Sequence, residues 1–559
     1  MSEQTISSRK NAKLSALVTV AVVITCAFLV VRTILFLIGE GFWYERLAAG
    51  ALLFAEMFFM INSIAYFANI LRVLGGHDRG IKAPDELPEL EDYPPIAIVV
   101  SSYHEPVEVV EANLVCFRNL TYPNKQIYFL DDTRYDLATH DVEEIQQYRC
   151  VIDDLCRRTG INLFRRRWHG AKAGMINDFL QFIEGRPPDG YEFHQFQKTS
   201  KPGTEKYIAV FDADMNPLPD FAEGLVQVME KNEKIAFVQT PQYYSNFESN
   251  RVARAAGLQQ VVFYEFICEG KSSQDAMFCC GTNVMFRRQA LIDVGGLDET
   301  SVTEDFATSI KLHLKGWNSA YVNRICAFGM GPQDLGGYFK QQFRWALGTV
   351  GLFRPILWRL VRHPGCLPPS KWFEYLISST YYLVGWAFLI LLICPVIYLF
   401  FNVPRFFAHP GIFFLFFAPY LALTIVAFLN TLRSRMYRWG DIYQGLLLAN
   451  IAFPVYMRAS LLGLLGVRGR FGITPKSGST SLPLRLLWPQ IGAMTATLAA
   501  AVWGLNRLYY LQEPIPALLV NILWCLYNFG LISSVFYFNK AEKKSTPVHS
   551  TGLPPERSA

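Results

Sequence analysis

The sequence has few charged residues, no long basic stretch and no cysteine motif. Asp, Glu, Lys and Arg make up 18% of its 559 residues and the net charge is +5, so nothing indicates nucleic-acid binding. The 11 cysteines include no Cys-x-x-Cys pair and no metal-ligand spacing, and Cys279 and Cys280 are adjacent. This pattern disfavours a disulfide framework and indicates reduced thiols in a protein that faces the cytosol. No internal repeat is present.

Apolar residues are abundant, at 51%, and they are gathered into long runs. A helix needs about 20 mainly apolar residues to cross a bilayer core, and six runs reach that length. The first run is too long for the apolar region of a signal peptide, and no small-residue cleavage site follows it. The predicted spans are 14–38, 47–71, 376–401, 412–432, 486–505 and 517–538.

Lys and Arg flank the ends of the spans that would face one compartment. Basic residues lie at 9–13 before the first span, at 433–438 after the fourth and at 540–544 after the sixth. By the positive-inside rule, both termini and the large central segment are cytoplasmic. We therefore expect a multi-pass protein of the cell membrane (plasma or inner), with the lipid bilayer as a partner. Arg32 and Glu56 lie inside apolar runs, where packing or snorkelling explains them better than transport chemistry.

Residues 443–466 are apolar on much of their circumference but carry Pro454 and Arg458. An interfacial helix is favoured here over a seventh span, which would move the basic C-terminal tail outside. The expected organisation is a cytoplasmic lead (1–13), two transmembrane helices (14–72), an α/β domain (95–345), an interfacial segment (346–371), two transmembrane helices (372–432), an interfacial helix with a loop (442–480), two transmembrane helices (484–538) and a disordered cytoplasmic tail (539–559).

In the central segment, runs of strand-forming residues end in paired acids. Tyr207–Phe211 leads into Asp212 and Asp214, and Gln126–Leu130 leads into Asp131 and Asp132. Buried parallel strands have this pattern, and open α/β sheets bind ligands at the carboxyl ends of their strands. Residues two apart on an extended chain point the same way, so a DxD pair offers two hard oxygen donors to a hydrated divalent cation that also holds a diphosphate. A solvated acidic turn is the simpler explanation for one such pair alone.

Strands alternate with helical stretches over about 250 residues, which predicts one α/β domain with a mainly parallel sheet. Residues 184–206 interrupt this pattern as an extra polar loop before the DxD strand. Long loops without structure are uncommon in compact domains, so the segment is either disordered or a contact surface.

Two later motifs strengthen the interpretation of the paired acids as a ligand site. They are Thr303-Glu304-Asp305 and Gln341-Gln-Phe-Arg344-Trp345. The order D, DxD, TED, QxxRW resembles that of the processive family 2 glycosyltransferases over residues 96–480. Shorter motifs resemble the cellulose synthase branch: SYHEP, HGAKAGMIN, VQTPQ, FCCGTN and FGITPK. Hyaluronan and chitin synthases share the acids and QxxRW but match these shorter motifs less well. The resemblance implies a GT-A, Rossmann-like domain on a multi-pass helical membrane protein.

The resemblance also implies a site for a UDP-sugar donor. Mg²⁺ or Mn²⁺ on Asp214, with Asp212 nearby, would neutralise the leaving diphosphate, and the planar fork of Arg344 suits the same group. Without the resemblance, Tyr103 is an ordinary aromatic at a strand end and Lys172 a solvated charge. The implied donor-binding residues are Tyr103, Glu105, Asp131, Asp132, Lys172, Asp212, Asp214, Gln341, Arg344, Phe471, Thr474 and Lys476, of which the last three belong to a loop similar to the gating loop of the branch.

For catalysis, the resemblance implies the TED motif: Asp305, with Glu304 and Thr303. Asp305 would deprotonate the acceptor hydroxyl, and one direct displacement would invert an α-linked donor to a β-linked product. Without the resemblance, Asp305 is equally well explained as a helix-capping acid and Trp345 as a core residue. The implied acceptor-binding residues are Trp345, Phe278, Cys280 and Thr282.

The expected function is processive polymerisation of UDP-glucose into a β-glucan (cellulose, β-1,3- or mixed-linkage) and its passage across the membrane. The alternatives are a hyaluronan- or chitin-type synthase with an N-acetylated UDP-sugar, and a nucleotide-regulated transporter or channel, which would not need a general base. Whether accessory export subunits or a homo-oligomer take part stays open. Three departures from bacterial cellulose synthases are Asp131-Asp-Thr in place of DDG, the insertion at 184–206, and a tail of fewer than 25 residues after the last span, which predicts no cyclic-di-GMP-binding domain.

Overall fold

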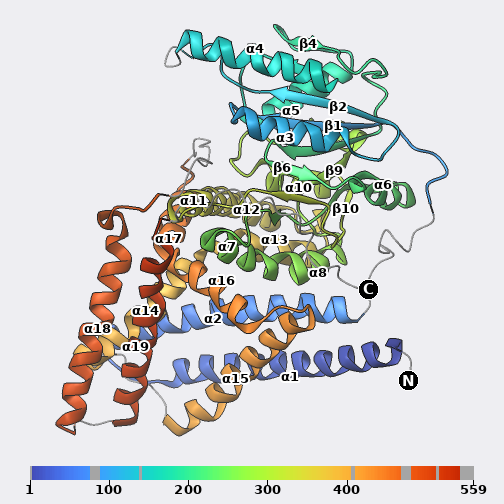
Figure 1. Ribbon diagram of the computed structural model, residues 1–559. Coiled ribbons are helices and arrows are strands. Elements are labelled where there is room, and N and C mark those ends of the chain that lie inside the picture. The colour runs from blue at the N-terminus through green and yellow to red at the C-terminus, as the bar shows by residue number, and fades with distance from the viewer. Residues whose placement is uncertain are drawn as a thin grey trace.

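The computed structural model describes residues 3–75, 89–137, 141–403, 410–467, 480–511 and 515–541, without the side chains of 3–10 and 410–414. It has an α/β domain beside a layer of long helices (Figure 1). In these residues the main sheet has the strand order β10-β7-β9-β5-β1-β2-β3-β4 and a second sheet has the order β6-β11-β8. The strands are β1 (Ile96–Ser102), β2 (Lys125–Asp131), β3 (Asn162–Arg165), β4 (Glu192–His194), β5 (Tyr207–Asp212), β6 (Met215–Pro217), β7 (Ile235–Gln239), β8 (Tyr243–Tyr244), β9 (Val284–Arg287), β10 (Asn318–Tyr321) and β11 (Ala327–Gly329).

Strand β1 lies near the centre of the main sheet and pairs in parallel with β2 and β5. Further parallel pairs join β2 to β3 and β7 to β10. The sheet is nevertheless mixed, because β9 runs antiparallel between β5 and β7, and β4 runs antiparallel to β3. The expected α/β domain is confirmed, with two antiparallel strands that the sequence pattern did not reveal.

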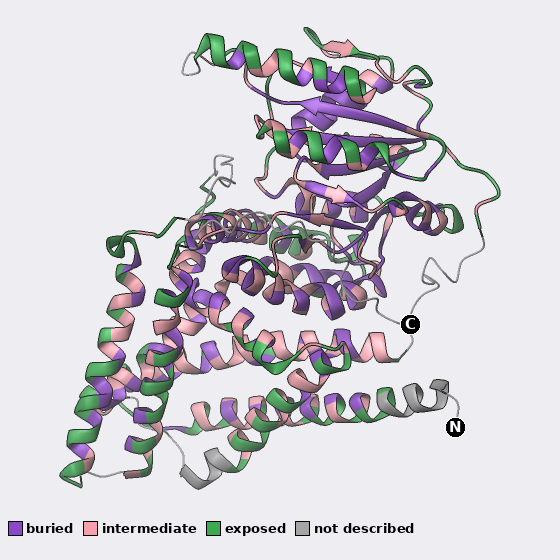
Figure 2. Ribbon diagram, viewed as in Figure 1, coloured by how far each residue is buried: buried purple, intermediate pink, exposed green. Residues whose placement is uncertain are grey.

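The central strands are apolar throughout because both faces of the sheet are covered. Along β1, Ile96, Ile98 and Val100 face one core, and Ala97 and Val99 face the other. Figure 2 shows these strands buried and the outer helices exposed along their outward faces. Helices α3 (Val107–Arg118), α4 (Val142–Thr159) and α6 (Phe221–Lys231) contribute to the first core, and α5 (Ala171–Ile183), α9 (Arg288–Asp293) and α10 (Glu304–Leu314) to the second.

The 184–206 segment packs along the edge of the sheet, so a disordered loop is the wrong alternative. Strand β4 lies within it and pairs with β3. The fully buried carboxylate of Glu205 accepts hydrogen bonds from the Tyr128 hydroxyl (2.5 Å) and from the Gly203 N–H (2.7 Å). The Ser200 hydroxyl donates to the side chain of Gln126 at 2.7 Å. The insertion therefore covers the β2 and β3 side of the domain.

Shorter helices lie between the domain and the long helices (Figure 1). They are α7 (Arg251–Val262), a π-helical turn (Phe263–Cys268), α8 (Glu269–Ser272), α11 (Leu335–Gly351), α12 (Phe353–Arg362) and a 3-10 turn (Pro364–Cys366). Helix α11 runs through the boundary expected at 345/346, so the QxxRW motif and the start of the predicted interfacial segment share one helix. A buried ion pair between Lys271 and Glu374 (2.7 Å), joined by Arg72 (2.7 Å), ties α8 to two of the long helices.

Six helices within the described residues are long and apolar enough to cross a membrane, at 11–38, 43–74, 369–401, 415–434, 484–509 and 515–538, which agrees with the six predicted spans. They comprise α1 (Glu3–Ile38), α2 (Trp43–Leu74), α13 (Pro369–Thr380) with a 3-10 turn (Tyr381–Leu383) and α14 (Val384–Phe401), α15 (Pro410–Ser434), a 3-10 turn (Leu484–Leu487) with α18 (Trp488–Tyr509), and α19 (Ile515–Phe538).

Helices α16 (Trp439–Ile451) and α17 (Phe453–Leu464) occupy the stretch predicted to be interfacial. Together they are apolar enough for a seventh span, but they meet at an angle of 52°. The choice between interfacial helix and span therefore stays a prediction. The end of α19 contacts α7, because the Tyr537 carbonyl accepts a hydrogen bond from Arg251 at 3.1 Å.

Candidate active site

The candidate site is built on the edge where three neighbouring parallel strands end. Ser101 of β1 lies opposite Asp212 of β5, and Ser102 lies opposite Asp131 of β2. The residues that follow these strands therefore meet at one place, as expected from the strand-end acids. This register brings Tyr103, Asp132 and Asp214 to a common cavity.

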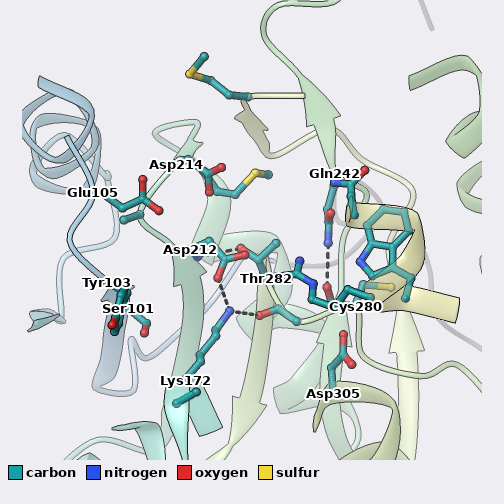
Figure 3. Close-up of a pocket in the computed structure, with 18 of the residues that line it drawn as sticks. Ser101, Tyr103, Glu105, Lys172, Asp212, Asp214, Gln242, Cys280, Thr282 and Asp305 are labelled. Carbon is teal, nitrogen blue, oxygen red and sulfur yellow. Dashed lines mark hydrogen bonds and ion pairs between the residues drawn. The ribbon is translucent and has the colours of Figure 1, made fainter. Parts of the chain in front are cut away.

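The cavity has a volume of about 510 Å³ and is lined by residues from the strand-end acids, the TED motif, the QxxRW motif and four of the shorter motifs. Figure 3 shows several of its side chains pointing toward a shared space above Lys172 and Asp305. The predicted residues that line it are Tyr103, Glu105, Asp132, Lys172, Asp212, Asp214, Cys280, Thr282, Thr303, Glu304, Asp305, Gln341, Arg344 and Trp345.

The first acid of the DxD motif is held by Lys172, in the first turn of α5. Asp212 forms an ion pair with the Lys172 ammonium, and the Asp212 N–H donates to the Thr282 hydroxyl at 3.0 Å. The same ammonium donates to the Gly281 carbonyl at 2.7 Å (Figure 3). Burial disfavours the charged ammonium, but the carboxylates of Asp212 and Glu304 outweigh it and raise the pKa of Lys172.

Asp305 lies in the first turn of α10, directly after Thr303 and Glu304. Its Oδ1 accepts the N–H of the next residue, Phe306, at 2.8 Å, whereas Thr303 occupies the N-cap position of the helix. Burial, followed by the neighbouring Glu304 carboxylate, raises the pKa of Asp305 to about 7. Lys172 and Arg344 oppose that shift. A carboxyl group with a pKa near neutrality is suited to general-base catalysis.

Helix α11 carries the QxxRW motif and packs closely on the TED motif. A Cβ at Gly348 would lie 2.5 Å from Thr303 Cγ2, so this approach requires glycine. Arg344 and Trp345 line the cavity about one turn earlier on the same helix. The buried Gln342 does not line the cavity and accepts a hydrogen bond from the Tyr456 hydroxyl of α17 at 3.2 Å. Helix α11 thus joins the site to α17.

Two predicted residues do not line the cavity. Asp131 is buried and accepts hydrogen bonds from the Tyr135 hydroxyl (2.5 Å) and from Arg165 Nε (2.7 Å). Phe278 packs edge-on against Phe306 with ring centres 4.8 Å apart. Asp131 is thus covered by Tyr135 and Arg165, and Phe278 packs against a residue of α10. Phe471, Thr474 and Lys476 lie outside the described residues.

Sequence reasoning missed several lining residues, including Ser101, Trp168, Gln242 and Tyr244. Trp168 precedes the HGAKAGMIN motif and is 38% exposed, with the guanidinium of Arg134 4.6 Å from the ring centre. Gln242 ends the VQTPQ motif and donates to the Cys280 carbonyl at 2.9 Å. Both lie in or beside quoted motifs, which was the available signal.

Asp132 is the second lining group with a pKa near neutrality. Burial raises its pKa to about 7, against the attraction of Arg166, whose guanidinium lies 3.2 Å away. Arg166 also lies 3.2 Å from Asp178 and donates to the His169 carbonyl at 2.6 Å. This cluster fixes the loop that precedes Lys172.

The donor set in the cavity fits a cation of the magnesium type. In the part of the chain that the structure describes, no group of three or more His, Cys, Asp or Glu side chains gathers as a metal site. The cavity instead offers the carboxylates of Asp212 and Asp214. Mg²⁺ is commonly held in this way, by one or two carboxylates with substrate phosphates and water.

Comparison with known proteins accounts for this arrangement. Residues 97–295 match the sequence model for glycosyl transferase family 2, and residues 207–432 match that for glycosyl transferase family group 2. The chain therefore contains a glycosyltransferase domain of the family 2 type, within residues 97–432. The matched regions contain the strand-end acids, the TED motif and the QxxRW motif.

The chain is similar to cellulose synthases over most of its length. It is 26% identical to the UDP-forming cellulose synthase catalytic subunit of Pseudomonas fluorescens, over 94% of this chain and 68% of that protein. It is 37% identical to a UDP-forming cellulose synthase of Dictyostelium discoideum, over 34% of this chain and 16% of that protein. Cellulose synthase 1 of Komagataeibacter xylinus is 24% identical over 91% of this chain, which spans 31% of that relative. Among solved structures, a mannosyltransferase from Pyrobaculum calidifontis, in complex with GDP-Man and Mn²⁺, aligns with a TM-score of 0.45 and 15% identity, over 74% of this chain and 98% of that one.

Proposed function

We propose that this glycosyltransferase is a processive, inverting enzyme that polymerises UDP-glucose into a β-glucan and passes the product through its membrane helices. The single observation that carries the proposal is the common cavity. It brings the DxD carboxylates, Asp305 and the Arg344–Trp345 pair into one space of about 510 Å³, which is large enough for a nucleotide sugar or part of one. The likeness to UDP-forming cellulose synthases supports the choice of donor.

The side chains divide into a donor group and an acceptor group. Tyr103 and Asp132 would contact the nucleoside, and Arg344 would bind the diphosphate through its fork of donors. Mg²⁺ or Mn²⁺ on Asp214, with Asp212 beside it, would neutralise charge on the departing diphosphate. Trp345 would stack against the terminal sugar of the glucan, beside Cys280 and Thr282.

Asp305 would act as the general base. The acceptor hydroxyl would attack the anomeric carbon as its proton passes to the Asp305 carboxylate, and the bond from that carbon to the diphosphate would break. One such displacement inverts the anomeric configuration. Its raised pKa leaves Asp305 partly deprotonated at neutral pH and basic enough to accept the proton.

The close packing of α11 on α17 supports a direct path from the site to the membrane helices. A Cβ at Gly463 of α17 would lie 2.9 Å from the Leu347 carbonyl of α11, so the two backbones are nearly in contact. Tyr382, just before α14, packs against Tyr456 of α17 with ring centres 5.3 Å apart. These rings lie next to the helix that carries Trp345, and aromatic faces can hold a sugar chain between additions.

The proposal is tested by incubating purified protein in lipid nanodiscs with Mg²⁺ and radiolabelled UDP-glucose, UDP-N-acetylglucosamine or UDP-glucuronate. We expect insoluble labelled polymer from UDP-glucose alone, and linkage-specific glucanases identify its linkage. Polymer from an N-acetylated donor would instead indicate a chitin- or hyaluronan-type synthase. Nucleotide binding without any polymer would favour a nucleotide-regulated transporter.

A further inference from the structure

Lys172 contacts both an acid of the DxD motif and the backbone that lies beside Asp305. Its side chain is only 12% exposed, and its ammonium has two partners on different elements: the Asp212 carboxylate at the end of β5 and the Gly281 carbonyl. Figure 3 shows the side chain rising from α5 to meet both. An ammonium group has three N–H donors, so these two contacts use most of its hydrogen-bonding capacity.

Gly281 belongs to a turn, residues 279–282, that lies against the candidate base. Its φ of +84° is in the left-handed region, which glycine adopts without strain. A Cβ at this position would lie 3.1 Å from Asp305 Oδ2. The Gly281 backbone is therefore in close contact with the carboxylate proposed to take the proton, and whatever holds Gly281 also limits where Asp305 can lie.

Two bonds fasten this turn to β5. One is the Lys172 bridge from Asp212 to the Gly281 carbonyl, and the other is the hydrogen bond from the Asp212 N–H to the Thr282 hydroxyl. On the other side of the turn, the Cys279 N–H donates to the Ser309 hydroxyl of α10, the helix of the base, at 2.8 Å. The turn thus connects the donor-side acid to the TED helix.

We propose that Lys172 is a positioning residue that, through the Gly281 turn, sets the place of Asp305 relative to the donor. This inference rests on the proposed function, and it gives Lys172 a different role from the donor binding that the family resemblance implies. The same ammonium also favours the deprotonated form of Asp305. The other charged or titratable groups around that carboxyl are Glu304 on α10, Arg344 on α11 and the thiols of Cys279 and Cys280.

The test compares Lys172→Met with Lys172→Arg, and with Lys206→Met as a matched control. Lys206 also forms an ion pair, with Glu230 at 2.7 Å, but it does not line the cavity. UDP affinity is measured by isothermal titration calorimetry with Mg²⁺ present, and kcat and KM for UDP-glucose are measured across a pH series. Small displacements of catalytic groups can cost about 100-fold in rate.

For Lys172→Met we expect kcat to fall at least about tenfold, with UDP affinity within about threefold of wild type. The acid limb of the pH profile of kcat should move to higher pH, because the Asp305 carboxylate loses a positive charge that stabilises its deprotonated form. Lys172→Arg should restore the position of that limb, and Lys206→Met should match wild type in every measurement.

The inference is overturned if Lys172→Met weakens UDP or uridine binding about as much as it lowers kcat/KM while kcat at saturating donor is unchanged. That result would assign Lys172 to the nucleobase. If Lys172→Met does not fold, Lys172→Arg and Thr282→Val take its place, and the inference then requires both to lower kcat more than they weaken UDP binding. Failure of the proposed function is distinct, because wild-type protein would then give no polymer from any donor.

Discussion

Asp334 and Thr480 join the start of the QxxRW helix to the chain that leads into the fifth span. Asp334 Oδ2 accepts hydrogen bonds from the Thr480 N–H (3.0 Å) and hydroxyl (2.9 Å), while Oδ1 caps α11 through the Gly337 N–H (2.7 Å). One carboxylate therefore stabilises the helix that carries Arg344 and Trp345 and also fixes the segment next to α18.

We expect Asp334→Ala to lower the midpoint of thermal unfolding in detergent more than Thr480→Val does. The first variant loses the helix cap, worth about 0.5–2 kcal/mol, together with both contacts to Thr480, whereas the second loses only the hydroxyl contact. Because the residues share hydrogen bonds, the double variant should be less destabilised than the sum of the two. Equal midpoints for Asp334→Ala and wild type would contradict this account of the α11 start.

Polymer formation should require a divalent cation. The two carboxylates are negatively charged and would repel a departing diphosphate unless a divalent cation lies between them. Treatment with EDTA should therefore abolish synthesis, and Mg²⁺ or Mn²⁺ should restore it. Asp214→Ala should weaken metal-dependent UDP binding in calorimetry. Undiminished polymer formation in EDTA would show that the reaction does not need a divalent cation.

The rate should rise with pH through neutrality. Asp305 and Asp132 each have a pKa raised to about 7, so both gain their negative charge as the pH increases past that value. The logarithm of kcat/KM for UDP-glucose should therefore climb between about pH 6 and 8 and then level off. Asp132→Asn should flatten part of this climb while the acid limb of kcat remains. A profile that is level through this range would show that neither group controls the reaction.

Much of the sheet was predictable because its strands are buried on both faces and read as continuous apolar runs. The same logic placed Asp132, Asp212 and Asp214 at one edge, since parallel strands end together. The antiparallel direction of β9 was not predicted, because an apolar run does not show in which direction its strand runs. The sequence did not decide between a disordered loop and a contact surface for the insertion at 184–206, because its contacts with β2 and β3 are long-range polar ones.

The side-chain partners in the site were the least predictable feature. A strand-end acid has the same sequence signature whether it faces a cavity, as Asp132 does, or is covered by Arg165 and Tyr135, as Asp131 is. Similarly, the sequence shows a lysine at a helix start but not its contact with Gly281, 109 residues away. These contacts arise from tertiary packing alone.

The six spans and their basic flanks predict a cytoplasmic catalytic domain. In a cysteine-depleted background, Glu40→Cys in the exposed connection between α1 and α2 should react with a membrane-impermeant maleimide on intact cells. Glu91→Cys, just before β1, should react only after the cells are opened. Labelling of Glu91→Cys on intact cells would reverse the predicted orientation.

The division of the site into a donor half and a base is the central claim, and Asp305→Asn tests it most directly. Asparagine keeps the size of the side chain but cannot take a proton, and general-base catalysis is worth about 10²–10⁴-fold in rate. UDP affinity with Mg²⁺ and the rate of glucan elongation are measured on Asp305→Asn, with Asp214→Ala alongside. The account predicts that Asp305→Asn binds UDP as wild type does and elongates at least about 100-fold more slowly, whereas Asp214→Ala loses UDP affinity. Normal elongation by Asp305→Asn, or a loss of UDP affinity as large as that of Asp214→Ala, would contradict it.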